Sequence, residues 1–467
     1  MSQTKWHQIK FEKLFENVKE AVLTAASAAL ENCFQNETGG FTRFPGLKDF
    51  VTLSGNAPVY LHDWKGDLVS VTNGLIYRID SSGNKTNVTG VPVQGGNRVI
   101  FDKTEDELVM AAGGQIVRLA AATSEVLSED APLSTHVGFI DNYLVAIEKD
   151  SGRFQHSLAG QYNQWDALDV FSADGKPDNL NCLLITPYRE LLLGGQDSIE
   201  QFERLPSGDT PFFRRWSVGE GIKCPYTSVP ADNGTWFINK MQEFVRASGQ
   251  VSEPASDDIG RTFEGVDDFT AAWAVLMHIA GQKFILLQLP YATNAYGTRG
   301  ITTIFDYRQR RWFNLYGWDN EMDRPNRWPG WSYYNLWGRH FVGGEGKIHE
   351  LDTATYANGG VTQRMLIRTA HLDGWGESRV DNIRIRVKRG VAGSNDTEPV
   401  ISIRARRDNK NWTRWKQKGF GLAGKREMVV EFGPYGCAHT WQFEAQVTDA
   451  CEVELVKLEA QVTPIGE

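Results

Sequence analysis

The chain has 467 residues, of which 41% are hydrophobic and 23% charged, and its formal net charge is −9. This length exceeds the roughly 100–200 residues of an ordinary domain, so we expect a large repeat fold or several domains. The acidic balance argues against a sequence-specific DNA reader, which usually carries a basic patch. Because no apolar run reaches about 18 residues, we expect no membrane-spanning helix.

Cysteine usage and the first residues indicate a cytoplasmic site of synthesis. The five cysteines are scattered and form no Cys-x-x-Cys pair, which favours reduced thiols over a disulfide framework or a zinc site. They are Cys33, Cys182, Cys224, Cys437 and Cys451. The first fifteen residues lack a basic region followed by an apolar stretch, so no secretory signal is expected.

Residues 9 to 34 carry apolar side chains at helical spacing, which predicts an amphipathic helix of several turns. The apolar positions are Phe11, Leu14, Val18, Val22, Ala25 and Ala29. An isolated helix in water could not leave such a stripe bare, so we expect it to pack on its own domain or on a neighbouring subunit. Residues 1–38 are therefore interpreted as an N-terminal helical docking segment.

A turn-rich motif, GGFTRFPGLKDF, follows at residues 39 to 50. Its paired glycines release the backbone, and Phe44-Pro45-Gly46 fixes one φ angle and frees the next. The motif separates the predicted helix from about three hundred residues of strand-like pattern. The chemistry of the motif alone indicates a turn.

Residues 39–361 contain a loose repeat in which an apolar strand, a polar or glycine turn and a second alternating strand recur. The seven units span residues 66–83, 106–123, 144–158, 191–205, 236–249, 302–317 and 340–353. A spacing of roughly 35–55 residues is that of one four-stranded propeller blade. We predict a mainly β fold with a β-propeller of about seven blades. Six blades are possible, and an irregular array of β-sandwiches is the alternative architecture.

The pattern changes again near residue 362. Residues 362–467 contain six or more alternating strands separated by Gly, Asn and Asp turns, which predicts a C-terminal antiparallel β-sandwich. The densest basic stretch, residues 384 to 418, lies in this part. Most of its charges alternate with apolar residues, which is typical of the solvated face of strands. Contact with an acidic protein or with nucleic acid is the other interpretation.

Motifs of catalysis and metal binding are absent: the chain has no phosphate-binding loop, no His-Glu-x-x-His and no Gly-x-Ser-x-Gly. His340 and His349 flank a glycine hairpin without a cluster of other ligands, so we expect no metal site. Four carboxylates stand beside arginines in residues 306 to 328, where they could serve glycoside hydrolysis. They are Asp306, Asp319, Glu321 and Asp323. We expect them to form structural pairs with these arginines, and we expect no catalytic residue and no cofactor.

Aromatic residues are concentrated between residues 311 and 341. A stretch of about 25 of these residues includes Trp312, Trp318, Trp328, Trp331, Tyr333, Tyr334 and Trp337. The cluster could pack between blades, contact another subunit or stack on sugars, and Trp, Tyr and Arg are enriched at interface hot spots. Candidate interface residues, including part of the predicted helix, are Phe11, Leu14, Val18, Trp318, Trp328, Trp331, Tyr333 and Trp337.

Three segments carry a resemblance to a known family. They are FTRFPGL, the stretch from LLLGGQDSIEQFERL to FVRASGQ (191 to 250) with its GEGIKCP turn, and SIRARRDNKNWTRW near the C-terminus. With these segments the chain resembles the packaged-DNA stabilisation proteins of short-tailed phages, which are also called tail hub or nozzle proteins. The resemblance covers most of the chain, although a long amphipathic N-terminal helix is not typical of the family.

The resemblance implies a structural virion protein and no enzyme. It also implies that GGFTRFPGLKDF is a hinge through which the N-terminal docking segment enters the first blade. Such a protein would form a hexameric ring below the portal and adaptor proteins, extend the DNA channel, retain packaged DNA and take part in its ejection. It would attach a tail needle or receptor-binding fibres or spikes, and it would lie in the virion tail after assembly in the host cytoplasm. Genomic DNA would pass through the lumen without sequence-specific binding, which suits an acidic chain. A glycan-binding or glycoside-hydrolysing propeller, such as a lectin or a sialidase relative, is the alternative.

Overall fold

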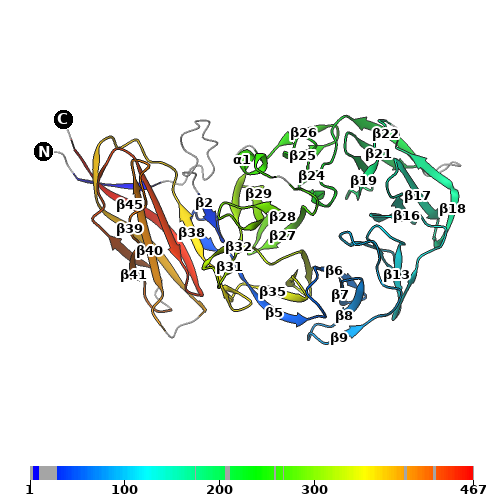
Figure 1. The fold of residues 1–467 in the computed structure, drawn as a ribbon, viewed down its shortest axis with the longest axis horizontal. Helices are drawn as coiled ribbons and strands as arrows, with labels where there is room; N and C mark the ends of the chain where they lie inside the picture. The colour runs from blue at the N-terminus through cyan, green and yellow to red at the C-terminus, as the bar shows by residue number, and fades with distance from the viewer. Residues whose placement is uncertain are drawn as a thin grey trace.

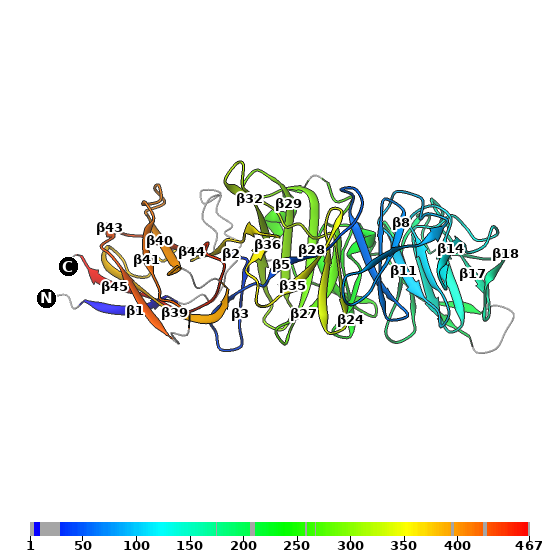
Figure 2. The same cartoon turned by 90° about the horizontal axis from the view of Figure 1, so that it is seen from below.

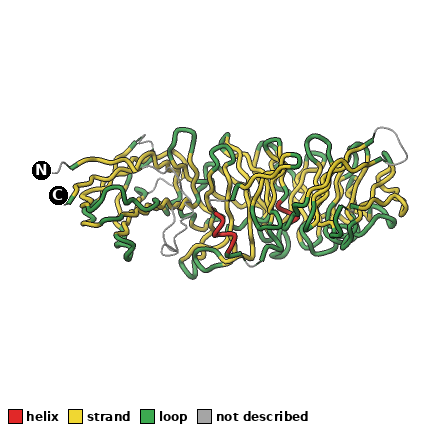
Figure 3. The backbone as a smooth tube through the Cα atoms, turned by 90° about the horizontal axis from the view of Figure 1, so that it is seen from above, coloured by secondary structure: helices red, strands yellow, loops and turns green. Residues whose placement is uncertain are grey.

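The computed structural model describes residues 4–9, 29–173, 175–205, 211–256, 259–266, 268–393, 397–423 and 427–465. Strands and loops make up nearly all of this part (Figure 3). The two short helical elements described are η1 (Pro225–Thr227) and α1 (Gly260–Glu264). No helix among the described residues is long and apolar enough to cross a membrane.

A closed ring of radial sheets and a two-layered β-sandwich lie side by side along the longest axis of the molecule (Figure 1). Both chain ends lie at the far end of the sandwich (Figure 2). The predictions of a propeller and a C-terminal sandwich are confirmed.

Six blades of the ring belong to separate sheets. From the centre outwards, blade 1 has β6 (Val59–Trp64), β7 (Asp67–Thr72), β8 (Leu75–Ile79) and β9 (Lys85–Asn87), and blade 2 has β11 (Ile100–Lys103), β12 (Leu108–Ala111), β13 (Val117–Ala120), β14 (Thr123–Val126) and β10 (Thr89–Gly90). Blade 3 has β15 (Val137–Ile140), β16 (Tyr143–Ile147), β17 (Arg153–Leu158) and β18 (Gln161–Ser172), and blade 4 has β19 (Leu180–Ile185), β20 (Leu191–Gly195), β21 (Ile199–Arg204) and β22 (Phe212–Val218). Blade 5 has β23 (Val229–Ala231), β24 (Gly234–Ile238), β25 (Phe244–Ser248) and β26 (Val251–Pro254), and blade 7 has β33 (Ser332–Leu336), β34 (Arg339–Gly343), β35 (Lys347–Asp352) and β5 (Gly46–Thr52).

Blade 6 differs because its sheet continues into the sandwich. Its strands are β27 (Trp273–Ile279), β28 (Gln282–Thr293), β29 (Arg299–Asp306) and β30 (Arg311–Asn314). The same sheet then runs through β2 (Ala29–Glu31), β38 (Met365–Arg368), β44 (Trp441–Val447), β40 (Val400–Arg407) and β41 (Lys416–Gly419). One nine-stranded sheet therefore forms a blade of the propeller and one layer of the sandwich.

The second layer of the sandwich contains both ends of the chain. It consists of β3 (Cys33–Gln35), β4 (Phe41–Arg43), β45 (Cys451–Pro464), β39 (Ser378–Gly393) and β42 (Met428–Phe432), with β1 (Lys5–Ile9) paired to β45 and β43 (Gly436–Ala438) paired to β39. Two small hairpins complete the fold: β31 (Tyr316–Asp319) with β32 (Arg324–Arg327), and β36 (Ala357–Asn358) with β37 (Val361–Thr362), of which β36 also pairs with β5.

The predicted hairpin repeat is confirmed strand by strand. Each of the seven units supplies one hairpin to one blade, and the first two, β7–β8 and β12–β13, occupy equivalent positions in adjacent sheets. Leu68 pairs with Ile79 in the first unit, as Leu108 pairs with Leu119 in the second. The turn of the first hairpin is Asn73-Gly74, which both have positive φ, as the two-residue turns that match strand twist require.

The N-terminal region differs from its prediction. Residues 10–28, which hold Phe11, Leu14 and Val18, lie outside the described residues. The ends of the predicted helix form strands: Ile9 belongs to β1 and residues 29–31 to β2. Helical spacing cannot reveal this outcome, because the two pairing partners, β45 and β38, lie more than three hundred residues away. The structure also divides the chain differently from the predicted boundary at residue 38, since β1, β3 and β4 are strands of the sandwich.

Candidate functional site

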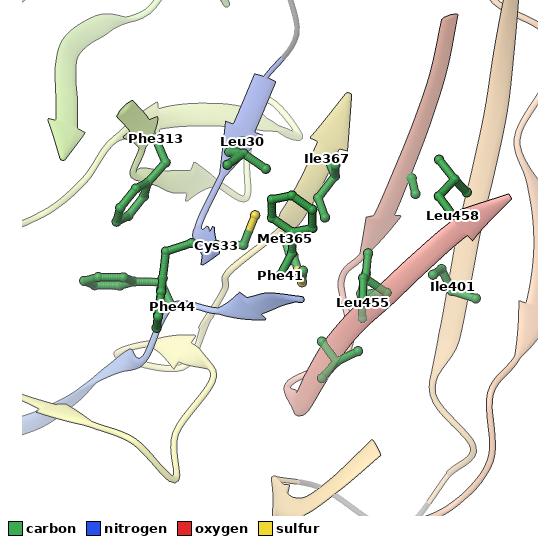
Figure 4. Packing of buried hydrophobic residues seen from close by; sticks show 14 of the residues in the cluster. Leu30, Cys33, Phe41, Phe44, Phe313, Met365, Ile367, Ile401, Leu455 and Leu458 are labelled. Atoms are coloured by element: carbon green, nitrogen blue, oxygen red, sulfur yellow. The ribbon is translucent and has the colours of Figure 1, made fainter. Parts of the chain in front are cut away.

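The propeller and the sandwich are joined by buried side chains at their junction. One apolar core runs through both, from Trp273 and Phe313 in blade 6 to Ile401 and Leu458 in the sandwich layers. Leu30, Phe41 and other residues of β2 to β4 fill the space between them (Figure 4).

The GGFTRFPGL motif lies within this junction, so its interpretation as a hinge to the first blade is wrong. Its strand β4 pairs with β45 of the sandwich, and the next strand, β5, closes the last blade as its outermost strand. Phe44 is fully buried between rings of blade 6 and β3. A Cβ on Gly46 would lie 2.4 Å from the carbonyl oxygen of Ala357, so only glycine fits where the chain passes into β5.

Arg43 of this motif binds three backbone carbonyls. Its guanidinium is buried and donates to the carbonyl oxygens of Asp449, Cys451 and Gln363. Burial lowers the pKa of Arg43 to about 10, so the side chain stays charged at neutral pH. The three carbonyls belong to the loop before β45, to the first residue of β45 and to the segment that leaves the propeller. Arg43 therefore connects the first and last parts of the sandwich to the end of the propeller.

Asn32 holds the turn between β2 and β3 against blade 6. Its Nδ2 donates to the carbonyl oxygens of Tyr316 at 3.1 Å and Arg364 at 2.8 Å, and its Oδ1 accepts a hydrogen bond from the Tyr316 amide at 2.9 Å. Asn32 is buried and has a φ of 52°, a conformation that asparagine tolerates better than most residues.

A buried charge pair completes the junction. Arg364 Nη2 lies 2.5 Å from Glu31 Oε2 and donates to Tyr296 Oη at 2.6 Å, and Tyr296 Oη also donates to Glu31 Oε1. Burial raises the pKa of Tyr296, so its hydroxyl stays a donor. We define the junction clamp as Glu31, Asn32, Arg43, Tyr296 and Arg364.

Two of the four predicted interface tryptophans, together with Tyr333, are core residues of the single chain. Trp328 is fully buried, and Trp331 and Tyr333 are 8% exposed. Trp331 stacks under Arg327, and Tyr333 bonds His340 Nδ1 through its hydroxyl at 2.7 Å. Burial within the single chain leaves these three side chains little surface for another subunit, and their predicted interface role stays a prediction.

Trp318 and Trp337 remain partly exposed. Trp318 lies on β31 with Arg364 over its ring at 5.4 Å. Trp337 lies in the β33–β34 turn, and its indole nitrogen donates to the carbonyl of Gly66 at 2.9 Å, which joins blade 7 to blade 1. These two are the predicted interface residues that the described surface still offers to a partner.

The four candidate carboxylates do not converge on a site, and the predicted pairing with arginines is not found for them among the described residues. Asp306 accepts hydrogen bonds from the backbone amides of Arg308 and Gln309 in the β29–β30 turn. Asp319 likewise accepts from the amides of Glu321 and Met322 in the β31–β32 turn. Burial raises the pKa of Asp306. These are turn-stabilising roles.

The described part of the chain contains neither a cluster of metal ligands nor a disulfide bond. No group of three or more His, Cys, Asp or Glu residues could hold a metal ion there. All five cysteines are free thiols, and four of them are buried. Burial raises the pKa of Cys182 to about 11, which keeps this thiol protonated.

Polar side chains line a cavity at the edge of the propeller and another at its centre. A cavity of about 630 Å³ lies beside the β31–β32 hairpin and is lined by Trp318, Asp319, Arg324 and Asn358, among others. Asn358 is 7% exposed, and neither polar atom of its side-chain amide has a hydrogen-bond partner among the described residues. A second cavity, of about 560 Å³, lies at the central axis of the propeller.

Comparison with known proteins assigns no family to the chain. No protein-family model and no curated protein matches the chain. Among solved structures, a streptogramin B lyase is 10% identical with a TM-score of 0.43 over 66% of this chain and 97% of its own. The virginiamycin B lyase of Staphylococcus aureus is 12% identical with a TM-score of 0.39 over 64% and 96%. The extracellular domain of a hybrid two-component system of B. thetaiotaomicron is 10% identical with a TM-score of 0.42 over 94% and 62%. Likeness at this level carries nothing about activity.

Proposed function

We propose that the chain is a structural subunit of a short-tailed phage tail, a hub or nozzle ring that extends the DNA channel and retains packaged DNA. The three sequence segments that resemble the tail hub family motivate this proposal. The junction clamp is the structural observation that supports it. A ring subunit has to pass load between the connector above it and the tail parts below it.

The junction clamp suits a subunit that transmits force, because it connects the two domains rigidly. Domains of one chain move relative to each other by default unless a large apolar interface joins them. Here a continuous sheet, a common core and a buried charge pair all join the propeller to the sandwich. The two parts are therefore one rigid unit whose outer surfaces keep a fixed distance.

The ring contacts follow from what the surface still offers. We propose that Trp318 and the sandwich strands contact a neighbouring copy, in a closed ring of about six copies with head-to-tail contacts. Portal and adaptor proteins, a tail needle and receptor-binding fibres or spikes are the proposed further partners. DNA would pass through the lumen of the ring.

Mass photometry and negative-stain electron microscopy test the proposal. The purified chain, alone and mixed with the portal–adaptor complex of the same phage, should give rings of about six copies or a ring capping the connector. Quantitative mass spectrometry of purified virions should find the chain at a matching copy number. A chain that stays monomeric with the connector present, and that is missing from virions, would contradict the proposal.

Glycan binding is a second candidate, which the cavity beside β31–β32 favours. The unpaired amide of Asn358 and the half-buried ring of Trp318 are groups that pair with sugar hydroxyls and stack on sugar faces. A glycan array should then show binding that Trp318→Ala abolishes. Hydrolysis is less well supported, because Asp306 and Asp319 lie in different turns. An array without any hit would leave the structural proposal alone.

A further inference from the structure

The central cavity of the propeller contains a guanidinium group without an acidic partner. Arg98 lies just before β11, and its Nη1 donates to the carbonyl of Trp331 at 2.7 Å. No carboxylate among the described residues forms an ion pair with it. A guanidinium has five N–H donors, so four of them have no protein acceptor in this part of the chain.

Aromatic rings hold this side chain in place. The guanidinium carbon lies 4.5 Å from the ring centre of Trp273 and 5.1 Å from that of Tyr60. These rings shield part of the charge from water, and the Arg98 side chain is half-buried. Burial lowers the pKa of Arg98 to about 10, which still leaves it cationic at neutral pH. A partly desolvated cation without a counter-charge is costly for a protein to keep.

Neutral hydroxyl donors share the cavity with Arg98. Tyr60 from the inner strand of blade 1 and Tyr226 from η1 both line it, and no hydrogen bond among the described residues involves either hydroxyl. Burial raises the pKa of Tyr226 to about 12, so this phenol can only be a neutral donor or acceptor. The ring of His136 stacks on Tyr226 at 5.3 Å and fixes its orientation.

The cavity is lined from several blades. Tyr60 comes from blade 1, Arg98 from the approach to blade 2, Tyr226 from the approach to blade 5, and Tyr291 from blade 6. Among the described residues, no Asp or Glu lines this cavity. A cationic fork, phenol donors and apolar ring faces, in about 560 Å³, form a site that is complementary to an anion attached to a flat or apolar body.

We propose that this central cavity binds a small organic oxyanion, a carboxylate or a phosphate ester, with Arg98 as the charged anchor and Tyr60 and Tyr226 as hydrogen-bond donors. The proposal concerns a single propeller and does not depend on ring assembly. A bound anion would supply the missing counter-charge and join the approach segments of opposite blades at the axis.

Calorimetry and thermal denaturation test the proposal with phenyl phosphate and benzoate, which share a ring and differ in the anion. Inorganic phosphate tests whether the ring contributes, and sodium chloride at matched ionic strength corrects for general salt effects. At least one organic probe should bind saturably, one per chain, with a Kd below about 10 mM, and should raise Tm. The better probe then distinguishes a phosphate ester from a carboxylate.

Two variants assign the binding to the named groups. Arg98→Met keeps length and apolar contacts but removes the charge, so affinity should fall at least about tenfold. Without ligand, Arg98→Met should be as stable as the parent protein or more so, whereas a merely structural arginine would give a loss. Arg78→Met is the matched control, because Arg78 pairs with Asp67 away from the cavity, and it should bind normally.

Three outcomes would overturn the proposal. They are no saturable binding of any probe up to about 10 mM, equal affinity in the parent protein and Arg98→Met, and binding that sodium chloride reproduces. If Arg98→Met does not fold, Tyr226→Phe decides the question, since it removes one donor without changing the shape of the ring. Unchanged affinity in Tyr226→Phe then refutes the site, and a loss of several-fold supports it.

Discussion

Asn32 and Tyr316 exchange hydrogen bonds in both directions: the asparagine amide donates to the Tyr316 carbonyl at 3.1 Å and accepts from the Tyr316 amide at 2.9 Å. A side chain in the β2–β3 turn thus imitates the pairing of a strand with the first residue of β31. This relationship makes the turn part of the junction clamp.

Asn32→Ala should destabilise the protein by about 2–4 kcal/mol, because it leaves buried backbone groups of Tyr316 and Arg364 without partners. Urea unfolding followed by tryptophan fluorescence measures this loss. Asn409→Ala is the control: Asn409 is exposed and also has positive φ, so its replacement should cost less than about 1 kcal/mol. Equal effects of the two substitutions would show that backbone conformation alone makes Asn32 important.

Arg43→Met should separate the unfolding of the sandwich from that of the propeller. The substitution removes the donor to three buried carbonyls, so we expect a loss of about 2–5 kcal/mol and a second transition in calorimetry. The exposed Arg379 pairs with Asp381, and Arg379→Met should change stability by less than about 1 kcal/mol. A single, unshifted transition in Arg43→Met would contradict the role assigned to this residue.

Trp328→Ala should destabilise folding by about 3–5 kcal/mol, because it opens a cavity under a fully buried ring. Trp318→Ala should cost less stability, since its ring is half exposed, and should weaken any ring assembly more strongly. Thermal denaturation and mass photometry of both variants make the comparison. Loss of assembly in a well-folded Trp328→Ala protein would restore the interface role that burial argues against.

The free energy of unfolding should decrease as the pH is lowered, because of His136. Burial lowers the pKa of this histidine to about 3, below its ordinary value of about 6.5 in an unfolded chain. Between these pH values the unfolded chain binds a proton that the folded chain does not. The contribution of His136 to the free energy of unfolding is therefore fully present above about pH 6.5, and it decreases by about 1.4 kcal/mol for each pH unit below that value.

The variant His136→Phe keeps a ring against Tyr226 and removes this titration. Between pH 7.5 and 5 its stability should change less than that of the parent protein, as measured by urea midpoints. The exposed His439 provides the control His439→Gln, which should keep the slope of the parent protein. An unchanged slope in His136→Phe would show that His136 is not the titrating group.

Strand propensity and turn chemistry were enough to predict the two β architectures. The alternation in residues 66–83 and 106–123 is a local property, and local hydrogen-bonded hairpins follow from it directly. The same holds for the strands after residue 362. The spacing of the hairpins then indicated the ring, because a blade cannot bury both of its faces alone.

The tertiary structure alone decided how the chain ends pair and which polar groups meet. The partners of β1 and β2 lie at the other end of the chain, and a sequence pattern does not encode which distant edge a strand joins. Trp328 and Trp318 lie in the same aromatic-rich stretch, which does not distinguish them. In the structure Trp328 is fully buried, whereas Trp318 is partly exposed. Arg98 and Tyr226 meet only because the ring closes, since each reaches the axis from a different blade.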